Sequence, residues 1–156
     1  YFQYLKIDYD LNYKYILELG CADFPALSYC HNLGKSYVIE PLTSPDLKKI
    51  CRKLHIKLFS KAAEFTHFPA VDEIWIFNVL CHTFNPDAII AKAKKAADII
   101  RFFEPINTIY DKLHLQSFTM DYFIKHFGNV KHYPSNPDAI KFHIQECAYG
   151  VWKKIV

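Results

Sequence analysis

Two acidic residues and one glycine stand where a nucleotide-type ligand could be held. Glu18 and Gly20 lie at the end of one apolar run, and Glu40 ends the next one, 20 residues after Gly20. A glycine at a strand end allows a tight turn close to a ligand, and a carboxylate at this spacing suits the two hydroxyls of a ribose. Taken alone, Gly20 is equally consistent with a plain turn, and Glu40 with a solvated acid at a strand end. Their order and spacing together favour a nucleotide-type site.

Two histidines could supply a base for chemistry at such a site. His82 follows the apolar run of the predicted fourth strand. His114 lies in a predicted loop beyond the fifth, together with Tyr110 and Asp111, which could orient a substrate. A neutral imidazole is a competent base near pH 7. The alternative for both histidines is a capping or packing role. We place His114 ahead of His82 because its loop is expected on the ligand side.

The elements that must position these side chains alternate between short apolar runs and helix starts. Buried-strand patterns cover residues 15–19, 36–39, 56–59, 73–80 and 99–103. Helix-start signals predict helices over residues 23–31, 44–54, 85–97 and 119–128. Two final strands, over 130–133 and 142–152, are joined by a connection short enough for a hairpin. This order predicts an α/β sandwich with an open, mostly parallel sheet.

Composition narrows the class of protein. The 156 residues are 51% hydrophobic, which excludes a disordered chain and predicts one domain over residues 1–156. A net charge of +3 is too small to indicate a nucleic-acid or membrane-surface protein. Five scattered cysteines without C-x-x-C spacing predict free thiols, a cytoplasmic location and no metal site. Thirteen Phe and eleven Tyr exceed the needs of one core, so some are expected at an interface, such as that of a homo-oligomer.

The apolar runs and their flanking residues resemble the class I S-adenosylmethionine-dependent methyltransferases over nearly the whole chain. Residues 15–22 look like the first motif of that family and residues 38–40 like the second. Residues 62–64 are similar to the segment beside the adenine. The most specific match is 72–82 followed by 84–86, which looks like the fourth-strand motif. Residues 101–106 and 114–119 resemble the fifth strand and the next loop of the small-molecule branch.

The resemblance implies a cofactor, a fold and a set of roles. The cofactor would be S-adenosylmethionine, and the fold a Rossmann-like three-layer sandwich with seven strands, mostly parallel, and an antiparallel terminal strand. Residues 1–13 would be the remnant of an N-terminal helical element. His114 and His82 would be catalytic. The cofactor would be bound by Glu18, Gly20, Cys21, Ala22, Glu40, Ala62, Ala63, Asn78 and Val79.

Two functions remain open. The first is methyl transfer to a small molecule such as a sugar or metabolite, since no Asn-Pro-Pro-Tyr or Asp-Pro-Pro-Tyr segment of nucleic-acid base methylases follows the fourth strand. The second is a non-catalytic binding or assembly module of a longer chain. Ala22 and Phe24 replace usual glycines, and Ala62 a usual polar residue, which favours the second.

Two further expectations concern charged residues. Glu40 should contribute little to core packing, because it ends a strand and precedes Pro41. Arg101 and Glu104 flank the end of the fifth strand, where they would either orient a substrate or form paired charges at the surface or the sheet edge.

Overall fold

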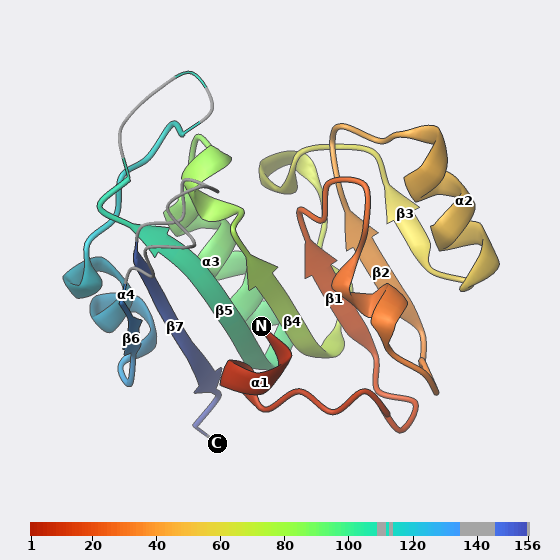
Figure 1. Ribbon diagram of the computed structural model, residues 1–156, viewed down its shortest axis with the longest axis horizontal. Helices are drawn as coiled ribbons and strands as arrows, with labels where there is room; N and C mark the ends of the chain where they lie inside the picture. Colours follow the sequence, from red (N-terminus) through yellow and green to blue (C-terminus); the bar gives the residue numbers. More distant parts are fainter. Residues whose placement is uncertain (109–111, 113, 135–145, 156) are drawn as a thin grey trace.

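One seven-stranded sheet organises the chain (Figure 1), in a computed structural model that describes residues 1–108, 112, 114–134 and 146–155. The strands lie in the order β3-β2-β1-β4-β5-β7-β6. Their bounds are β1 Ile16–Leu19, β2 Ser36–Ile39, β3 Lys57–Phe59, β4 Val71–Phe77, β5 Ala97–Ile106, β6 Lys131–Tyr133 and β7 Glu146–Lys153. The α-helices are α1 Phe2–Leu5, α2 Pro45–Lys53, α3 Pro86–Ala96 and α4 Met120–Phe127. Three short 3-10 helices are η1 Ala26–Tyr29, η2 Ala63–Phe65 and η3 Leu80–His82.

The sheet has the predicted topology. Strands β1 to β5 pair in parallel, whereas β7 is antiparallel to both of its neighbours, β5 and β6. The strand order reverses between β1 and β4, which is the place where open α/β sheets bind ligands. The antiparallel pairing of β6 with β7 confirms the prediction that the last two strands pair with each other. The predicted strand residues 142–145 and the connection over 135–137 lie outside the described residues.

Each face of the sheet has its own hydrophobic core, because successive strand residues point to opposite sides. Ile74 and Ile76 pack with α3 and α4 on one face. Trp75 and Phe77 pack with α1, η1 and α2 on the other. Figure 1 shows α3 behind β4 and β5, with α1 in front of them. The three-layer sandwich predicted from the resemblance is therefore confirmed.

The helices begin where their cap residues stand. The side chains of Ser44, Asn85 and Thr119 accept hydrogen bonds from the backbone N–H of Leu47, Ala88 and Tyr122, respectively. Within the described part of the chain, no helix combines the length and apolar character needed to cross a bilayer.

The helix predicted over residues 23–31 is wrong in type and length. Only Ala26–Tyr29 are helical, as the 3-10 helix η1. Pro25 precedes this helix with an extended backbone instead of occupying its first position. The cause is tertiary, because the buried Glu18 carboxylate binds the first two N–H groups of η1 and so fixes where the turn begins.

The predicted surface or sheet-edge pairing of Arg101 with Glu104 is also wrong. The Arg101 guanidinium donates to the buried Glu73 carboxylate at 2.6 Å and to the Leu5 carbonyl at 2.6 Å. Lys14 binds the same carboxylate at 3.0 Å. Glu73 therefore ties the N-terminal segment to β4 and β5, and Glu104 has a separate role described below.

Candidate functional site

The turn after β1 lies directly against the loop after β4. Gly20 has φ +57°, and a Cβ atom built on it would lie 2.5 Å from Cγ2 of Val79. Its N–H donates to the Ile39 carbonyl at 2.8 Å, which also holds the turn against the end of β2. Two segments predicted to bind a cofactor thus meet where the strand order reverses. Only glycine satisfies both the backbone angle and the close approach.

Glu40 lies beside this turn, as its spacing predicted, but its carboxylate is already occupied by backbone donors. Oε2 accepts from the N–H groups of Cys21 and Ala22, both at 3.0 Å. Oε1 accepts from the N–H of Leu42 at 2.8 Å. The side chain is only 6% exposed. Glu40 was expected to contribute little to core packing. The structure shows that its carboxylate contributes to the fold in another way, by holding the Gly20 turn in place.

Glu18 holds the segment that follows this turn, from inside the protein. Its two oxygens accept from the N–H groups of Ala26, at 2.7 Å, and Leu27, at 3.0 Å. Burial raises the pKa of the Glu18 carboxyl to about 7, outweighing the opposite effect of the two backbone hydrogen bonds. Both oxygens are directed at η1, so the contribution of Glu18 to this site is to position the segment that follows Ala22.

A third carboxylate, that of Glu104, has a role of the same kind, which the sequence did not predict. Glu104 is completely buried in β5, and its oxygens accept from the N–H groups of Val79 at 2.8 Å and Leu80 at 3.0 Å. Burial raises the pKa of Glu104 to about 8, against the effect of these backbone donors. An acid within the apolar run that ends β5, between Phe103 and Pro105, was the available signal. Glu104 holds the loop after β4 as Glu40 holds the loop after β1.

Asn78 makes the turn at the end of β4. Its φ is +57°, a region in which asparagine is more common than most residues. Its N–H donates to the Phe103 carbonyl at 2.9 Å, and its side-chain Oδ1 lies 3.8 Å from Sγ of Cys81. The turn therefore brings Asn78 and Val79 to the Gly20 side of the loop and directs the chain into η3.

The two predicted histidines meet beside this loop. The ring centroids of His82, in η3, and His114 are 5.0 Å apart. Gln116 fixes the two segments together, because its N–H donates to the Cys81 carbonyl at 3.1 Å and its Nε2 to the Thr83 carbonyl at 3.4 Å. The histidines are thus neighbours, although they lie 32 positions apart in the sequence. Tyr110 and Asp111 lie outside the described residues.

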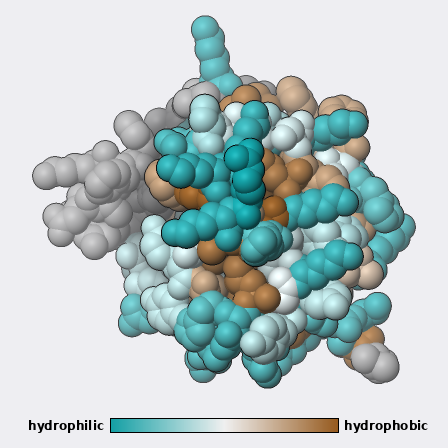
Figure 2. All heavy atoms as spheres, turned by 90° about the vertical axis from the view of Figure 1, so that its right-hand side faces the viewer, coloured by the Kyte–Doolittle hydropathy of each residue, from teal (hydrophilic) through white to brown (hydrophobic). Residues whose placement is uncertain are grey.

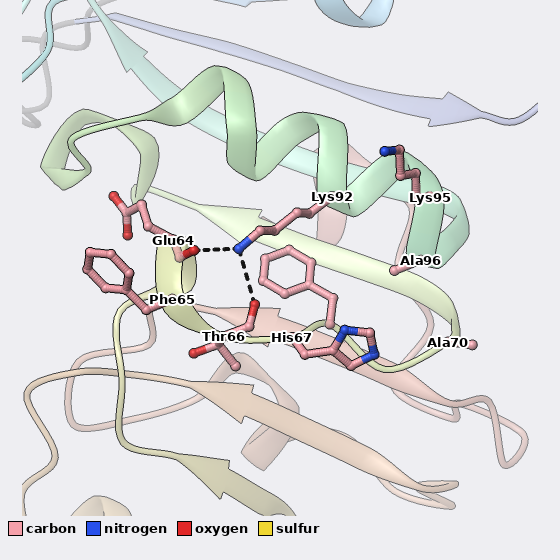
Figure 3. Close-up of a pocket in the computed structure, with 9 residues that line it drawn as sticks. Glu64, Phe65, Thr66, His67, Ala70, Lys92, Lys95 and Ala96 are labelled. Atoms are coloured by element: carbon pink, nitrogen blue, oxygen red, sulfur yellow. Dashed lines mark hydrogen bonds between the residues drawn. The ribbon is translucent and has the colours of Figure 1, made fainter.

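The predicted adenine segment is held by a lysine from α3. Ala62 precedes η2, and Ala63 begins it. The Lys92 ammonium donates to the carbonyls of Ala63, Glu64 and Thr66. Figure 3 shows the bonds to Glu64 and Thr66. This segment also contacts the loop after η3, because the Glu64 carboxylate accepts from the N–H of Phe84 at 2.9 Å.

A pocket of about 550 Å³ opens between η2 and α3. Figure 3 shows Lys92 pointing across it to η2, with Lys95 further along the same helix. Gly20, Glu40 and Asn78 are not among its lining residues. The pocket therefore lies beside the predicted cofactor site, and the lysine that crosses it already holds backbone carbonyls.

The edge of the sheet at β3 and α2 presents a different surface. Figure 2 shows hydrophilic side chains around a narrow apolar strip on this side of the molecule. Four exposed basic residues of α2 contribute to the hydrophilic part, namely Lys48, Lys49, Arg52 and Lys53. Leu47 and Cys51 are buried on the opposite side of the helix. This arrangement is that of an ordinary amphipathic helix, with its charges in solvent.

No protein-family profile matches the chain, and no curated protein sequence matches it. Solved structures are similar in fold. The plantazolicin methyltransferase BpumL, in complex with S-adenosylhomocysteine, is 14% identical with a TM-score of 0.64, over 91% of this chain and 76% of that one. The 1,6-didemethyltoxoflavin-N1-methyltransferase of Burkholderia thailandensis, solved with S-adenosylhomocysteine, is 12% identical with a TM-score of 0.64, over 92% and 72%. The (4+2)-cyclase SpnF is 14% identical with a TM-score of 0.69, over 92% and 75%.

These likenesses establish the fold. The protein has the class I methyltransferase fold, as its sequence motifs predicted. The neighbours include enzymes with different reactions, among them a cyclase, so the fold alone does not determine the function.

Proposed function

We propose that the protein is an S-adenosylmethionine-dependent methyltransferase that acts on a small molecule. The observation that carries the proposal is the contact of the Gly20 turn with Val79 at the point where the strand order reverses. Glu40 and Glu104 hold the two loops in contact there. Two structures of the same fold were solved with S-adenosylhomocysteine, the demethylated product of this cofactor, which supports the choice of ligand.

The residues at this edge of the sheet divide into those that would contact the cofactor and those that hold the contacts in place. The turn of Gly20, Cys21 and Ala22 would bind its methionine part. Glu40 Oε1 has one backbone partner, so it keeps capacity for a ribose hydroxyl, since a carboxylate has about four acceptor sites. Residues 62–63 would lie beside the adenine, and Asn78 and Val79 would form the opposite wall.

The acceptor would bind on the side of His82 and His114. The cofactor supplies an electrophilic methyl group on a sulfonium, so the protein has to orient the acceptor and remove its proton. His114 is half-buried and His82 exposed, which places one imidazole inside the site and one at its mouth. Phe65 and Phe84 are 81% and 80% exposed and follow the two neighbouring segments, so they offer apolar surface to a small metabolite.

A second candidate is a binding module that does not transfer methyl groups. It is favoured by the hydrogen bonds that Glu40 already makes to the Gly20 turn, because they compete with a ribose for the same oxygens. Phe24, where the family has a glycine, is 63% exposed and points away from the core. Its ring therefore does not fill the interior of the turn. The replacement of glycine by Phe24 is for this reason a weaker argument for a non-catalytic module than the sequence alone suggested.

Thermal melts with S-adenosylhomocysteine, followed by transfer of a labelled methyl group, test the proposal. We expect the ligand to raise the melting temperature, and labelled S-adenosylmethionine to modify small-molecule acceptors from a metabolite extract. Polynucleotides should remain unlabelled. Absence of any stabilisation would favour the binding module. Labelling of polynucleotides alone would contradict the small-molecule assignment.

A further inference from the structure

Cys81, His82 and His114 bring three metal-ligating side chains together, which the sequence did not predict. Their ligand atoms all lie within 4.8 Å of one another. The three residues come from η3 and from the loop after β5, separated by more than 30 positions. This is the one group of three or more such side chains in the described ranges that could hold a metal ion.

The two segments are built to keep these side chains together. Gln116 donates from its N–H and its Nε2 to the carbonyls of Cys81 and Thr83, which flank His82. The loop that contains His114 is closed at its base, since the N–H of Asn107 donates to the Phe118 carbonyl at 2.8 Å. These hydrogen bonds hold the two segments side by side.

The buried carboxylate of Glu104 fixes the segment that contains Cys81. It accepts hydrogen bonds from the N–H groups of Val79 and Leu80, the two residues immediately before Cys81. Cys81 is completely buried, and its Sγ lies 3.8 Å from Oδ1 of Asn78. The sulfur position is therefore set by the fold, whereas the exposed His82 is at the open side of the group.

We propose that Cys81, His82 and His114 form a binding site for a zinc ion. One thiolate and two imidazoles are ligands that Zn²⁺ prefers, and three protein ligands leave a fourth position open, as in catalytic zinc sites. Ligand atoms around one tetrahedral zinc lie about 3.5 Å apart. Zinc binding would therefore require the ligand atoms to move closer together, and the His82 side chain is the exposed member of the group. Hard cations such as Mg²⁺ require oxygen ligands, which this group does not supply.

The site has a consequence for chemistry at the same edge of the sheet. A zinc ion with an open position lowers the pKa of a bound hydroxyl or thiol, so it would take over the activation of an acceptor from the imidazoles. Only this consequence rests on the proposed methyl transfer. Binding of the metal does not depend on it.

Competition between the reduced, metal-free protein and a chromophoric zinc chelator tests the site. We expect one Zn²⁺ per chain and no competition by a large excess of Mg²⁺. His82→Gln and His114→Gln should each weaken zinc binding by about 100-fold, because each removes one of three ligands. His67→Gln, at an exposed histidine outside the group, should bind zinc like the parent.

A cobalt titration gives an independent readout of the sulfur ligand. Co²⁺ should produce a thiolate-to-metal charge-transfer absorption that disappears in Cys81→Ser and persists in Cys51→Ser, an equally buried cysteine in the other core. If Cys81→Ser does not fold, the two histidine variants decide. Zinc binding that survives both His82→Gln and His114→Gln, or an absence of stoichiometric zinc, would overturn the proposal. Neither result would bear on the proposed methyl transfer, because binding of S-adenosylhomocysteine is measured separately.

Discussion

The Glu40 carboxylate accepts a hydrogen bond from the backbone N–H of Ala22 at 3.0 Å. The same oxygen also accepts from Cys21. A residue at the end of β2 thus determines the shape of the turn after β1, and the proposed ribose acid is also a structural part of the proposed methionine site. Binding and stability are therefore linked at this position.

Glu40→Gln should weaken binding of S-adenosylhomocysteine by about tenfold and also lower stability. The amide presents an NH₂ group to backbone N–H donors, and hydrogen bonds to a charged group contribute about 1.5–3 kcal/mol each. Isothermal titration and urea unfolding measure the two effects. Glu64→Gln is the matched control, because Glu64 also accepts a backbone hydrogen bond near the site. Unchanged affinity in Glu40→Gln would remove Glu40 from the cofactor site.

Gly20→Ala should destabilise the protein by about 2–4 kcal/mol, since it combines a left-handed backbone angle with a clash. The clash is specific, because the added Cβ would lie 2.5 Å from Cγ2 of Val79. A double-mutant cycle with Val79→Ala should recover at least about 1 kcal/mol in urea unfolding. Strictly additive losses would contradict the close contact of the two loops.

The buried Glu18 should make stability fall as pH rises. Its pKa is raised from 4.5 to about 7 in the folded protein. A raised carboxyl pKa favours folding below the unfolded value, and this stabilisation is lost as pH increases through about 7. Relative to Glu18→Gln, the parent should lose on the order of 3 kcal/mol between pH 4.5 and 8. Parallel unfolding free energies of the two proteins across this range would show that Glu18 does not titrate as described.

None of the five cysteines forms a disulfide in the described residues, which contain all five, as predicted, and four of them are buried. Burial raises the pKa of the thiols of Cys21, Cys30 and Cys147, so they should react slowly in the folded protein. Alkylation in denaturant without reductant should modify all five, counted by mass spectrometry. A pair that reacts only after reduction would reveal a disulfide.

Local patterns were sufficient for most of the fold. The caps at Ser44, Asn85 and Thr119 and the apolar strand runs act within a few residues, so the sequence displays them directly. The helix predicted after Asp23 failed because its start depends on Glu18, whose side chain binds the backbone of η1 across the turn. A contact between a side chain and a distant backbone segment does not appear in the hydrophobic periodicity of the sequence.

The sequence predicted the individual residues of the site but not the contacts between them. Spacing identified Gly20, Glu40 and the two histidines one at a time. It gave no indication that Glu104 holds the loop before Cys81, or that Cys81 joins the histidines, because these residues meet only after β4 and β5 pair. The distance between residues on different strands depends on the strand order, which a single sequence shows only indirectly.

Titration of the full chain with S-adenosylhomocysteine, in parallel with NAD, tests the cofactor site most directly. We expect saturable 1:1 binding of S-adenosylhomocysteine, weakened in Glu40→Gln, and no saturable binding of NAD, since Ala22 and Phe24 replace glycines that a pyrophosphate requires. Saturable binding of NAD with no heat from S-adenosylhomocysteine would contradict it.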